Sequence, residues 1–359
     1  MLNYHAALRE QGIMNTFERM VVMIFGGIAL ICSPLVAHYD DEDNVVFSPP
    51  ALSAVANADL VYFNGISPLS NPAGMVLSKR YELSYSQASY YENAFSVNML
   101  SFRMALDSTR FCGLAAGYRL IPGIADNRLL QTNDGESPVY DESRIRWTSE
   151  SKAYVQVNYA HLFEVPWARL AVGASVNASR QRLLEYAGYG IGLNAGVLGI
   201  VPAANLSIGV VVTNLTTRYI RWSPSYAVYV PPSLRIGIGW DKTFTYLYGR
   251  LRLIYRTVDL LGNEGINTAR RNDISADSLY TPQQTGAADP VDFVLAGALG
   301  GEYLILDRVA LRLGVQRGRM LSFGAGVLLL DDRRAAIDFA CQTSDELPPT
   351  YQFALRYSW

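Results

Sequence analysis

Charge is scarce in this sequence of 359 residues, and lysine is almost absent from it. Charged residues make up 17% of the chain, and the only lysines are Lys79, Lys152 and Lys242. The formal net charge is −2, whereas proteins that bind the phosphate backbone of nucleic acids carry clusters of basic residues. The composition therefore gives no reason to expect a nucleic-acid partner.

Long apolar runs are missing as well, except near the N-terminus. Half of the residues are hydrophobic. Beyond residue 37, however, no run comes close to the ~20 consecutive apolar residues that a membrane-spanning helix needs. This excludes a bundle of transmembrane helices, and it indicates a protein whose apolar residues alternate with polar ones.

Cysteine and histidine are too few for a metal centre or a disulfide framework. Cys112 and Cys341 fall on the apolar rows of predicted strands far apart in the sequence, so we expect two unpaired thiols. His161 continues an apolar row, and no nucleophile motif accompanies it. The sequence therefore predicts neither an enzyme nor a bound metal or cofactor.

The one continuous apolar run is MVVMIFGGIALIC, Met20–Cys32, which follows Arg19. The segment SPLVA comes next and leads into the acidic stretch HYDDEDN. A basic residue, a short apolar core and a small residue before a polar start are typical of a secretory signal peptide. We therefore expect residues 1–37 to be a signal peptide that is cleaved after Ala37.

From residue 81 onward the sequence alternates with a period of two. In VALRLGVQ, 309–316, Val and Leu alternate with Ala, Arg, Gly and Gln, which is the pattern of strands with one apolar and one polar face. In AFSVNMLSFRM the apolar row changes phase after Met99, which predicts a β-bulge. The alternating segments lie near 81–87, 94–105, 111–121, 152–162, 169–182, 188–198, 205–215, 233–241, 244–258, 291–300, 308–317, 320–330, 334–342 and 350–359.

The connections between these segments differ in length according to their order. Those that follow even-numbered strands include the short FEVPWA, DKT and DDRR, whereas 122–151 and 259–290 follow odd-numbered strands and are long and polar. Short turns at one end, long loops at the other and an even number of strands are typical of bacterial outer-membrane barrels. The sequence thus predicts an all-β fold, a transmembrane antiparallel β-barrel of about fourteen strands formed by 81–359 and surrounded by outer-membrane lipid.

The polar rows of the strands indicate which face is inside. They are rich in glycine and small polar residues and poor in lysine and glutamate, unlike the surface of a water-soluble sandwich. In a membrane barrel such rows face the lumen. Several arginines on them are predicted to form an internal ladder with carboxylates: Arg103, Arg119, Arg235, Arg250, Arg252, Arg312 and Arg356.

The chain ends on a strand, YQFALRYSW, with an apolar row and a terminal aromatic residue. Because a sheet in lipid must leave no open edge, we expect this strand to pair with the first one, near Tyr81–Ser86. A terminal strand of this kind resembles the signal read by the outer-membrane barrel assembly machinery, which is therefore an expected partner. The residues of this predicted signal are Tyr351, Phe353, Leu355, Tyr357 and Trp359.

The stretch ALSAVANADLVYFNGISPLSNPAGMVLS, Ala51–Ser78, resembles the N-terminal plug of FadL-like outer-membrane proteins. The motif that carries the resemblance is Asn71-Pro72-Ala73-Gly74, although Asn-Pro also begins ordinary turns. Downstream, the block 301–340 is similar to the PorV/PorQ branch of that superfamily. The resemblance implies a fourteen-stranded barrel whose segment 38–80 folds into the lumen as a plug. The segment NGISPLS departs from the family pattern as an insertion.

Three functions are compatible with this resemblance. FadL-like proteins pass hydrophobic ligands such as long-chain fatty acids, which is the function we favour. PorV-like proteins instead bind secreted protein cargo and shuttle it within the type IX secretion system. A structural or adhesive surface barrel is the third possibility, with 122–151 and 259–290 as its contact surface.

Overall fold

The computed structural model describes residues 47–62, 67, 70–77, 81–126, 128, 131–133, 138–140, 143, 145–223, 226–261, 296–316, 320–330, 334–343 and 347–359. The predicted signal peptide 1–37, the first residues of the predicted plug segment 38–80 and most of the predicted loop 259–290 lie outside the described residues.

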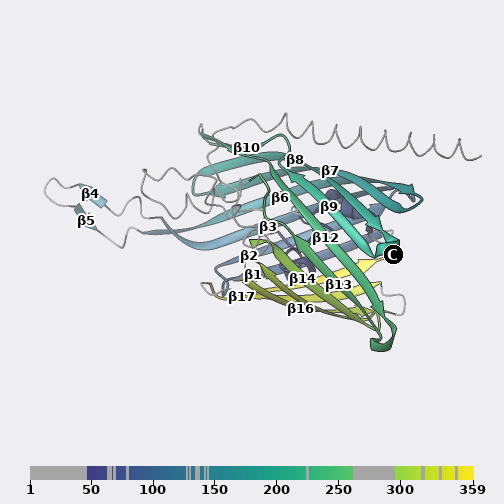
Figure 1. Ribbon diagram of the computed structural model, residues 1–359. Coiled ribbons are helices and arrows are strands. Elements are labelled where there is room, and N and C mark those ends of the chain that lie inside the picture. Colours follow the sequence, from purple (N-terminus) through teal and green to yellow (C-terminus); the bar gives the residue numbers. More distant parts are fainter. Residues whose placement is uncertain are drawn as a thin grey trace, which may run out of the picture. The chain divides into compact units, whose positions relative to one another are not determined.

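A closed antiparallel β-barrel of fourteen strands is the main feature of the fold (Figure 1). Its strands are β1 (Tyr81–Tyr90), β2 (Phe95–Ala105), β3 (Arg110–Asp126), β6 (Arg146–Val165), β7 (Ala168–Leu183), β8 (Tyr186–Val201), β9 (Leu206–Thr213), β12 (Ser233–Phe244), β13 (Gly249–Arg256), β14 (Ala298–Ile305), β15 (Val309–Gln316), β16 (Met320–Leu329), β17 (Ala335–Thr343) and β18 (Thr350–Ser358). Each strand pairs with the next, and β18 pairs with β1 to close the ring. The predicted fold class is confirmed.

The two ends of the barrel differ in the length of their connections. We call one the short-turn end, where the connections are 106–109, 166–167, 202–205, 245–248, 306–308 and 330–334. We call the other the long-loop end, where 127–145, 214–232 and 257–297 connect the strands, together with shorter connections. In outer-membrane barrels the short turns face the periplasm and the long loops face the cell exterior.

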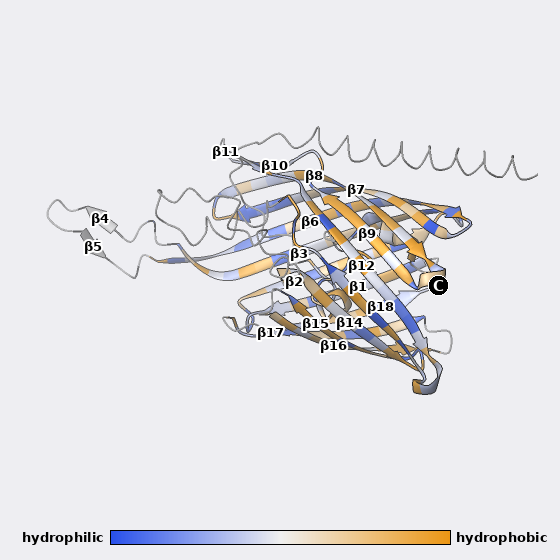
Figure 2. Ribbon diagram, in the orientation of Figure 1, coloured by the Kyte–Doolittle hydropathy of each residue, from blue (hydrophilic) through white to orange (hydrophobic). Residues whose placement is uncertain are grey.

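The apolar rows of the strands face outward. On β1, Leu83 and Tyr85 are 42% and 41% exposed, whereas the intervening Ser84 is buried. Figure 2 shows the corresponding alternation of hydrophobic and hydrophilic residues along the strands. An apolar exterior that surrounds a polar interior is stable only in lipid, since water would favour the opposite arrangement. The protein is therefore an integral outer-membrane barrel. Both Cys112 and Cys341 are free thiols, as predicted.

In the described part of the chain before β1, two short helices are present, α3 (Pro50–Ser53) and the 3₁₀ helix η1 (Pro72–Leu77). Among the described residues, no helix is long and apolar enough to cross a membrane.

The β-bulge predicted after Met99 is wrong. β2 pairs with β1 and with β3 in unbroken register, so the alternation of its faces does not shift. Val97 and Met99 instead face the interior, where they are buried at 3% and 5% exposure. The change in the sequence pattern thus marks apolar residues on the lumenal face. In the β3–β6 pair, by contrast, the register shifts between Ile121 and Ile124.

Several strand boundaries also differ from the prediction, and β6, expected at 152–162, spans Arg146–Val165. The segment DKT was expected as a turn, but β12 continues to Phe244 because Asp241 faces inward and pairs with Arg250 and Arg252. The strand expected at 291–300 corresponds to β14, which extends through Gly300 and Gly301 to Ile305.

Two hairpins were not predicted. The strands β10 (Arg218–Trp222) and β11 (Tyr226–Val230) form one hairpin, which extends the sheet beside β8. The second, of β4 (Gln131–Asn133) and β5 (Pro138–Tyr140), is a separate two-stranded sheet in the connection between β3 and β6. These strands are too short to give a clear period-two signal.

Candidate functional site on the lumenal face

Residues 47–62 and 70–77, which we call the lumen segment, pack against inward-facing side chains of the barrel. The apolar core of this contact is continuous from segment to wall. The segment contributes Leu52, Val55, Ala56, Ala58, Val61, Tyr62, Ala73, Met75 and Val76, and the wall contributes Phe111, Ala115, Ala160, Leu162, Ala171, Leu198, Ile254 and Ala298. The predicted action of 38–80 as a plug that blocks passage stays a prediction.

Asn71 fixes the second half of the lumen segment to the wall. Its side-chain amide donates a hydrogen bond to the backbone carbonyl of Val197 on β8 at 2.8 Å. Its Oδ1 accepts one from the backbone N–H of Ala73 at 3.0 Å, and its carbonyl accepts one from Gly74 at 2.8 Å. An Asn that binds the backbone two residues on initiates a turn, and Pro72 supplies the fixed φ for the η1 helix that follows. The four residues of the predicted motif are therefore brought together and buried.

Glycines of the wall allow this close approach. A Cβ atom at Gly173 on β7 would lie 2.5 Å from the backbone of Pro72 and Ala73. A Cβ atom at Gly196 on β8 would overlap the side chain of Asn71. Backbone cannot rotate away as a side chain can, so any other residue at Gly173 would displace the segment or the strand.

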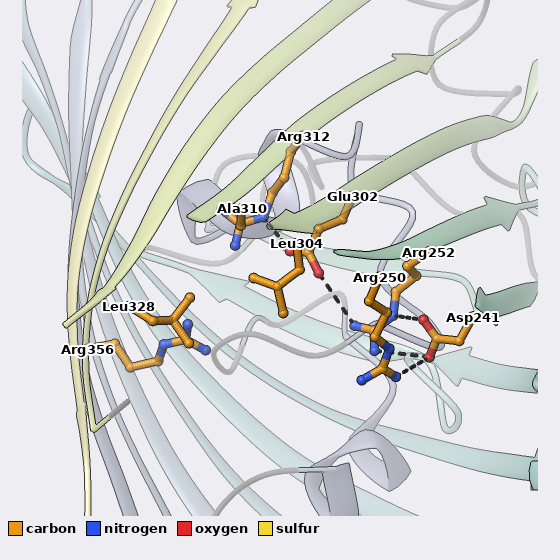
Figure 3. A pocket seen from close by; sticks show the side chains of 9 residues that line it. All are labelled: Asp241, Arg250, Arg252, Glu302, Leu304, Ala310, Arg312, Leu328 and Arg356. Carbon is orange, nitrogen blue, oxygen red and sulfur yellow. Dashed lines mark hydrogen bonds and ion pairs between the residues drawn. The ribbon is translucent and has the colours of Figure 1, made fainter. Parts of the chain in front are cut away.

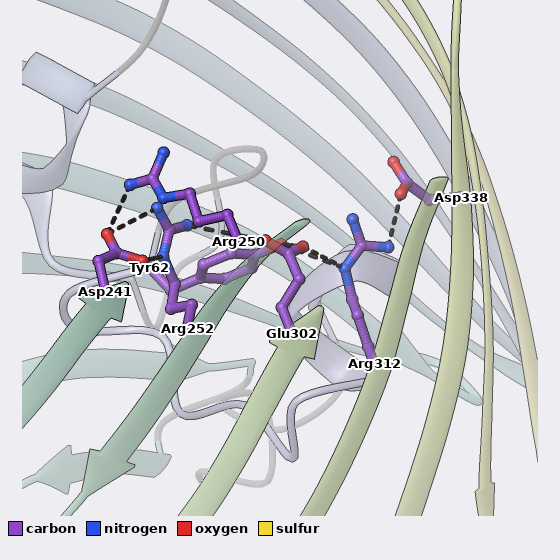
Figure 4. A network of polar contacts seen from close by, with 7 residues as sticks. All are labelled: Tyr62, Asp241, Arg250, Arg252, Glu302, Arg312 and Asp338. Atoms are coloured by element: carbon purple, nitrogen blue, oxygen red, sulfur yellow. Dashed lines mark hydrogen bonds and ion pairs between the residues drawn. The ribbon is translucent and has the colours of Figure 1, made fainter. Parts of the chain in front are cut away.

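Tyr62 joins the other half of the lumen segment to the wall (Figure 4). Its hydroxyl donates a hydrogen bond to Glu302 and accepts one from Nε of Arg312 at 3.1 Å. Arg312 also contacts Glu302 at 2.8 Å and Asp338 at 2.7 Å. The guanidinium of Arg252 lies 5.0 Å from the centroid of the Tyr62 ring. Burial raises the pKa of the Tyr62 hydroxyl, which therefore remains protonated and able to donate.

An ion-pair chain runs along the wall near the short-turn end. It links strands on both sides of the β1–β18 pair, and its members are, in order, Arg250, Asp241, Arg252, Glu302, Arg312, Asp338, Arg356, Glu82 and Arg103. Between Arg312 and Asp338 the intervening strand β16 carries Gly326, so no side chain separates the two groups. The predicted internal ladder is confirmed for the five arginines of this ion-pair chain, Arg119 pairs separately with Glu150, and Arg235 is not among its members.

A second charged contact holds the lumen segment through Asp59. Its carboxylate lies 3.6 Å from the guanidinium of Arg256 on β13, and Arg235 on β12 adds a further favourable charge. Burial raises the pKa of Asp59, and these two arginines oppose that rise. Both ends of the stretch 47–62 are thus attached to the wall, one by packing and the other by polar contacts.

A recess of about 160 Å³ opens beside the ion-pair chain (Figure 3). Its lining consists of Asp241, Arg250, Arg252, Glu302, Leu304, Ala310, Arg312, Leu328 and Arg356. Asp338 and Glu82 also face these arginines, so positive and negative groups nearly balance. The charged side chains therefore neutralise one another, and the recess by itself indicates no ligand.

An apolar and aromatic patch lies on the inner wall of β1, β2 and β6, nearer the long-loop end. The lumenal aromatic cluster consists of Phe47, Ala88, Tyr90, Val97, Met99 and Tyr154, with Tyr91 and Phe95 packed against it. Phe47 belongs to the lumen segment, and its ring stacks on Tyr154 of β6 at 5.4 Å between centroids. The rest of the inner wall carries mainly polar side chains, so this cluster is a local apolar surface within the lumen.

The terminal residues predicted as an assembly signal lie on the outer face of β18. Their exposed fractions range from 40% for Phe353 to 48% for Trp359, whereas Gln352 is buried and faces the lumen. Trp359 and Tyr81 exchange two backbone hydrogen bonds of 3.1 Å, and their rings stack at 5.7 Å. The predicted strand pairing is confirmed, and recognition by the assembly machinery stays a prediction.

Tyr62, Asp59, Val97 and Met99 were not predicted as site residues. Asp59 and Tyr62 carry polar groups within an otherwise apolar stretch, and this pattern in the sequence could have identified them. Within the described part of the chain, no group of three or more His, Cys, Asp or Glu residues has the geometry of a metal site. The ring of His161 packs against that of Phe163, 4.4 Å away.

No protein-family model and no curated protein matches the sequence. Among solved structures, the chain is similar to the toluene transporter TbuX of Ralstonia pickettii, with 14% identity over 88% of this chain and 99% of that one and a TM-score of 0.46. For the toluene transporter TodX of Pseudomonas putida the identity is 10%, the coverage 87% and 98%, and the TM-score 0.49. For the outer-membrane protein Omp33 of Acinetobacter baumannii these values are 8%, 78%, 98% and 0.40. These sequence identities and TM-scores are too low to assign a function.

Proposed function

We propose that the protein passes hydrophobic ligands, such as long-chain fatty acids, across the outer membrane. The lumenal aromatic cluster is the observation that carries the proposal. Its side chains are buried on the inner face of the barrel, which in a channel for hydrophilic solutes would be polar. Ligand sites for hydrophobic molecules are concave and lined mainly by apolar and aromatic residues.

Phe47 is the group that a ligand would replace. It belongs to the lumen segment and fills the space in front of Tyr154, so that its ring occupies the position of an apolar ligand. The rest of the segment is attached through the hydrogen bonds and ion pairs of Asn71, Asp59 and Tyr62. These contacts are non-covalent, so a path opens when a ligand displaces Phe47 and the remaining contacts then break as the segment shifts.

The proposal agrees with the resemblance of 51–78 to the plug of FadL-like proteins. Toluene transporters, which handle another hydrophobic molecule, are among the structures similar to the chain. Membership of the FadL-like superfamily is part of the same proposal.

Uptake of a labelled long-chain fatty acid by cells tests the proposal. Cells with the wild-type protein should accumulate the label faster than a deletion strain. The variant Met99→Gln makes the aromatic cluster polar at nearly constant size, and it should slow uptake by about tenfold, since burial of one large apolar group is worth about 1.5–3 kcal/mol. The matched control is Leu100→Met, which changes the neighbouring residue on the lipid-facing side and should have no effect.

Equal uptake in the wild-type and deletion strains would refute the proposal. Surface proteins retained in the periplasm of the same deletion strain would then support the PorV-like function, in which the barrel binds secreted cargo. Unchanged uptake in Met99→Gln alone, with normal uptake by the wild type, would show that the ligand takes another route through the barrel.

A further inference from the structure

Three arginines lie on the lipid-facing side of the barrel, and their position requires an explanation. Arg180 and Arg182 are on β7, and Arg221 is on β10; all three are exposed. Arg180 continues the outward row that includes Val172 and Val176. A guanidinium group facing lipid is unfavourable unless an anion or water meets it.

The three arginines lie close together in the sheet. Arg180 is opposite Tyr189 of β8, and Tyr189 is opposite Arg221 of β10, so the two arginines are two strand spacings apart, or about 10 Å. Arg182 follows on the same face of β7, about 7 Å along the strand from Arg180. The guanidinium of Arg180 also lies 5.8 Å from the centre of the Tyr189 ring. They form one basic patch, which we call the outer arginine patch.

The patch lies at the level of lipid head groups. The outward apolar residues of β7 run from Leu170 to Ala178. A tilted strand crosses the hydrocarbon layer with about 9–11 residues, so Arg180 lies at the edge of that layer towards the long-loop end. Outward tyrosines, which mark the membrane interface, accompany it: Tyr118, Tyr189, Tyr219 and Tyr229.

The nearby carboxylates already have other partners. Glu150 pairs with Arg119 inside the barrel, and Asp126 and Glu185 both pair with Arg128 at the rim. Among the described residues, no carboxylate forms an ion pair with Arg180, Arg182 or Arg221. The anion that meets them must therefore come from outside the described chain.

We propose that the outer arginine patch binds the phosphate groups of the outer-leaflet glycolipid, lipopolysaccharide, through its lipid A part. The long-loop end of an outer-membrane barrel faces the cell exterior, so the adjacent leaflet is the outer one. Guanidinium groups bind phosphate with two parallel hydrogen bonds, which suits closely spaced arginines. The inference concerns the lipid-facing surface and does not depend on what passes through the lumen.

Binding of purified lipid A to the folded full-length barrel in detergent tests the proposal, with native mass spectrometry as the readout. The probes are lipid A with two phosphates, lipid A with one phosphate, and phosphatidylglycerol. The triple variant R180A/R182A/R221A should bind the two-phosphate form at least ~30-fold more weakly, since one basic residue beside anionic lipid contributes several-fold. The control R169A changes an exposed arginine at the opposite end of β7 and should bind normally.

Three results would overturn the proposal: equal binding by the triple variant and the wild type, equal loss in R169A, or equal affinity for phosphatidylglycerol and lipid A. Heat-modifiable migration on gels checks that each variant is folded. If the triple variant does not fold, R221A provides the test, because β10 lies outside the closed ring of strands. It should then bind several-fold more weakly than the wild type, and unchanged binding would refute the assignment.

Discussion

At the scale of single residues, the lumen segment fits its wall because certain side chains are absent. Gly173 and Gly196 let the backbone at Pro72 and the side chain of Asn71 come into contact with the strands. The Asn71 amide then reaches the carbonyl of Val197, which a bulkier wall would keep out of range. The glycine-rich polar rows of the strands thus form the part of the inner face on which the lumen segment packs.

The substitution Gly173→Ala tests this fit. Overpacking of a well-packed contact costs about 1–3 kcal/mol, and here the new methyl group meets backbone. We expect a folded barrel in which amides of residues 70–77 exchange hydrogen for deuterium at least about fivefold faster. The control is Gly199→Ala, since a Cβ atom there meets a single atom at 3.9 Å. Unchanged exchange in Gly173→Ala, or an equal change in both variants, would contradict this account.

The residues Asn71–Gly74 were recognisable in the sequence, but their partners were not. A turn at Asn-Pro follows from local chemistry, because the side chain bonds to its own backbone. The contacts of Asn71 with β8 and of Pro72 with β7 join residues more than a hundred positions apart, and no local pattern encodes such pairs. The same holds for Tyr62 and Glu302.

At the scale of elements, charge pairs between strands connect the wall to the lumen segment. Arg312 is the central group, since it contacts Glu302, Asp338 and the Tyr62 hydroxyl. Loss of one partner from a buried ion pair leaves the other charge without compensation, which is more costly than the loss of a single hydrogen bond. Removal of Arg312 should therefore lower the stability of the barrel, whereas removal of the Tyr62 hydroxyl should mainly loosen the lumen segment.

The pair of variants Tyr62→Phe and Arg312→Met separates these contributions. Tyr62→Phe removes a hydrogen bond to a charged group, about 1.5–3 kcal/mol, and should increase amide exchange in 47–62 with little effect on barrel unfolding in urea. Arg312→Met leaves Glu302 and Asp338 with only their longer ion pairs to Arg252 and Arg356, and should destabilise the barrel itself by about 3–5 kcal/mol.

The double variant supplies the check. Arg312 contacts both the Tyr62 hydroxyl and Glu302, so its removal also changes the hydrogen bond between these two residues. The effects of the two substitutions should therefore not be additive. Strict additivity in both exchange and urea unfolding would show that Tyr62 is held independently of the ion-pair chain.

Element boundaries were predictable where alternation was regular and failed where charge or glycine interrupted it. β15 and β17 match their predicted ranges within one residue. The segment DKT was expected as a turn, because Asp is common in turns, and the strand that contains Gly300 was expected to end there. Inside a barrel, Asp241 has two arginine partners and Gly300 lies where Val55 approaches, so the strands continue.

At the scale of the whole molecule, the barrel depends on one pair of strands that are distant in sequence. β18 meets β1 along eight residue pairs, from Ser358 opposite Glu82 to Tyr351 opposite Ser89. The closed ring of fourteen strands leaves none of its own edges open to lipid, as the membrane requires. Strand count, face polarity and loop asymmetry were all visible in the sequence, since each follows from period-two alternation and chain order.

Deletion of Trp359 should impair assembly more than transport. The deletion removes two backbone hydrogen bonds with Tyr81 and an exposed aromatic residue at the end of the signal strand. We expect a several-fold lower amount of heat-modifiable barrel in outer membranes, with normal uptake per folded molecule. The control Trp167→Ala removes another exposed aromatic residue, in a short turn, and should assemble normally. A wild-type level of folded barrel after the deletion would rule out the predicted role of the last residue.

The place of β1 in the chain has a consequence for the order of events during biogenesis. The lumen segment directly precedes β1, and β1 is one side of the closing pair. The lumen segment is thus covalently attached beside the β1–β18 pair, and it is synthesised before any strand of the barrel. If the segment enters before β18 reaches β1, closure encloses it without a threading step. A segment that arrived late would have to enter through the end with short turns, past the ion-pair chain.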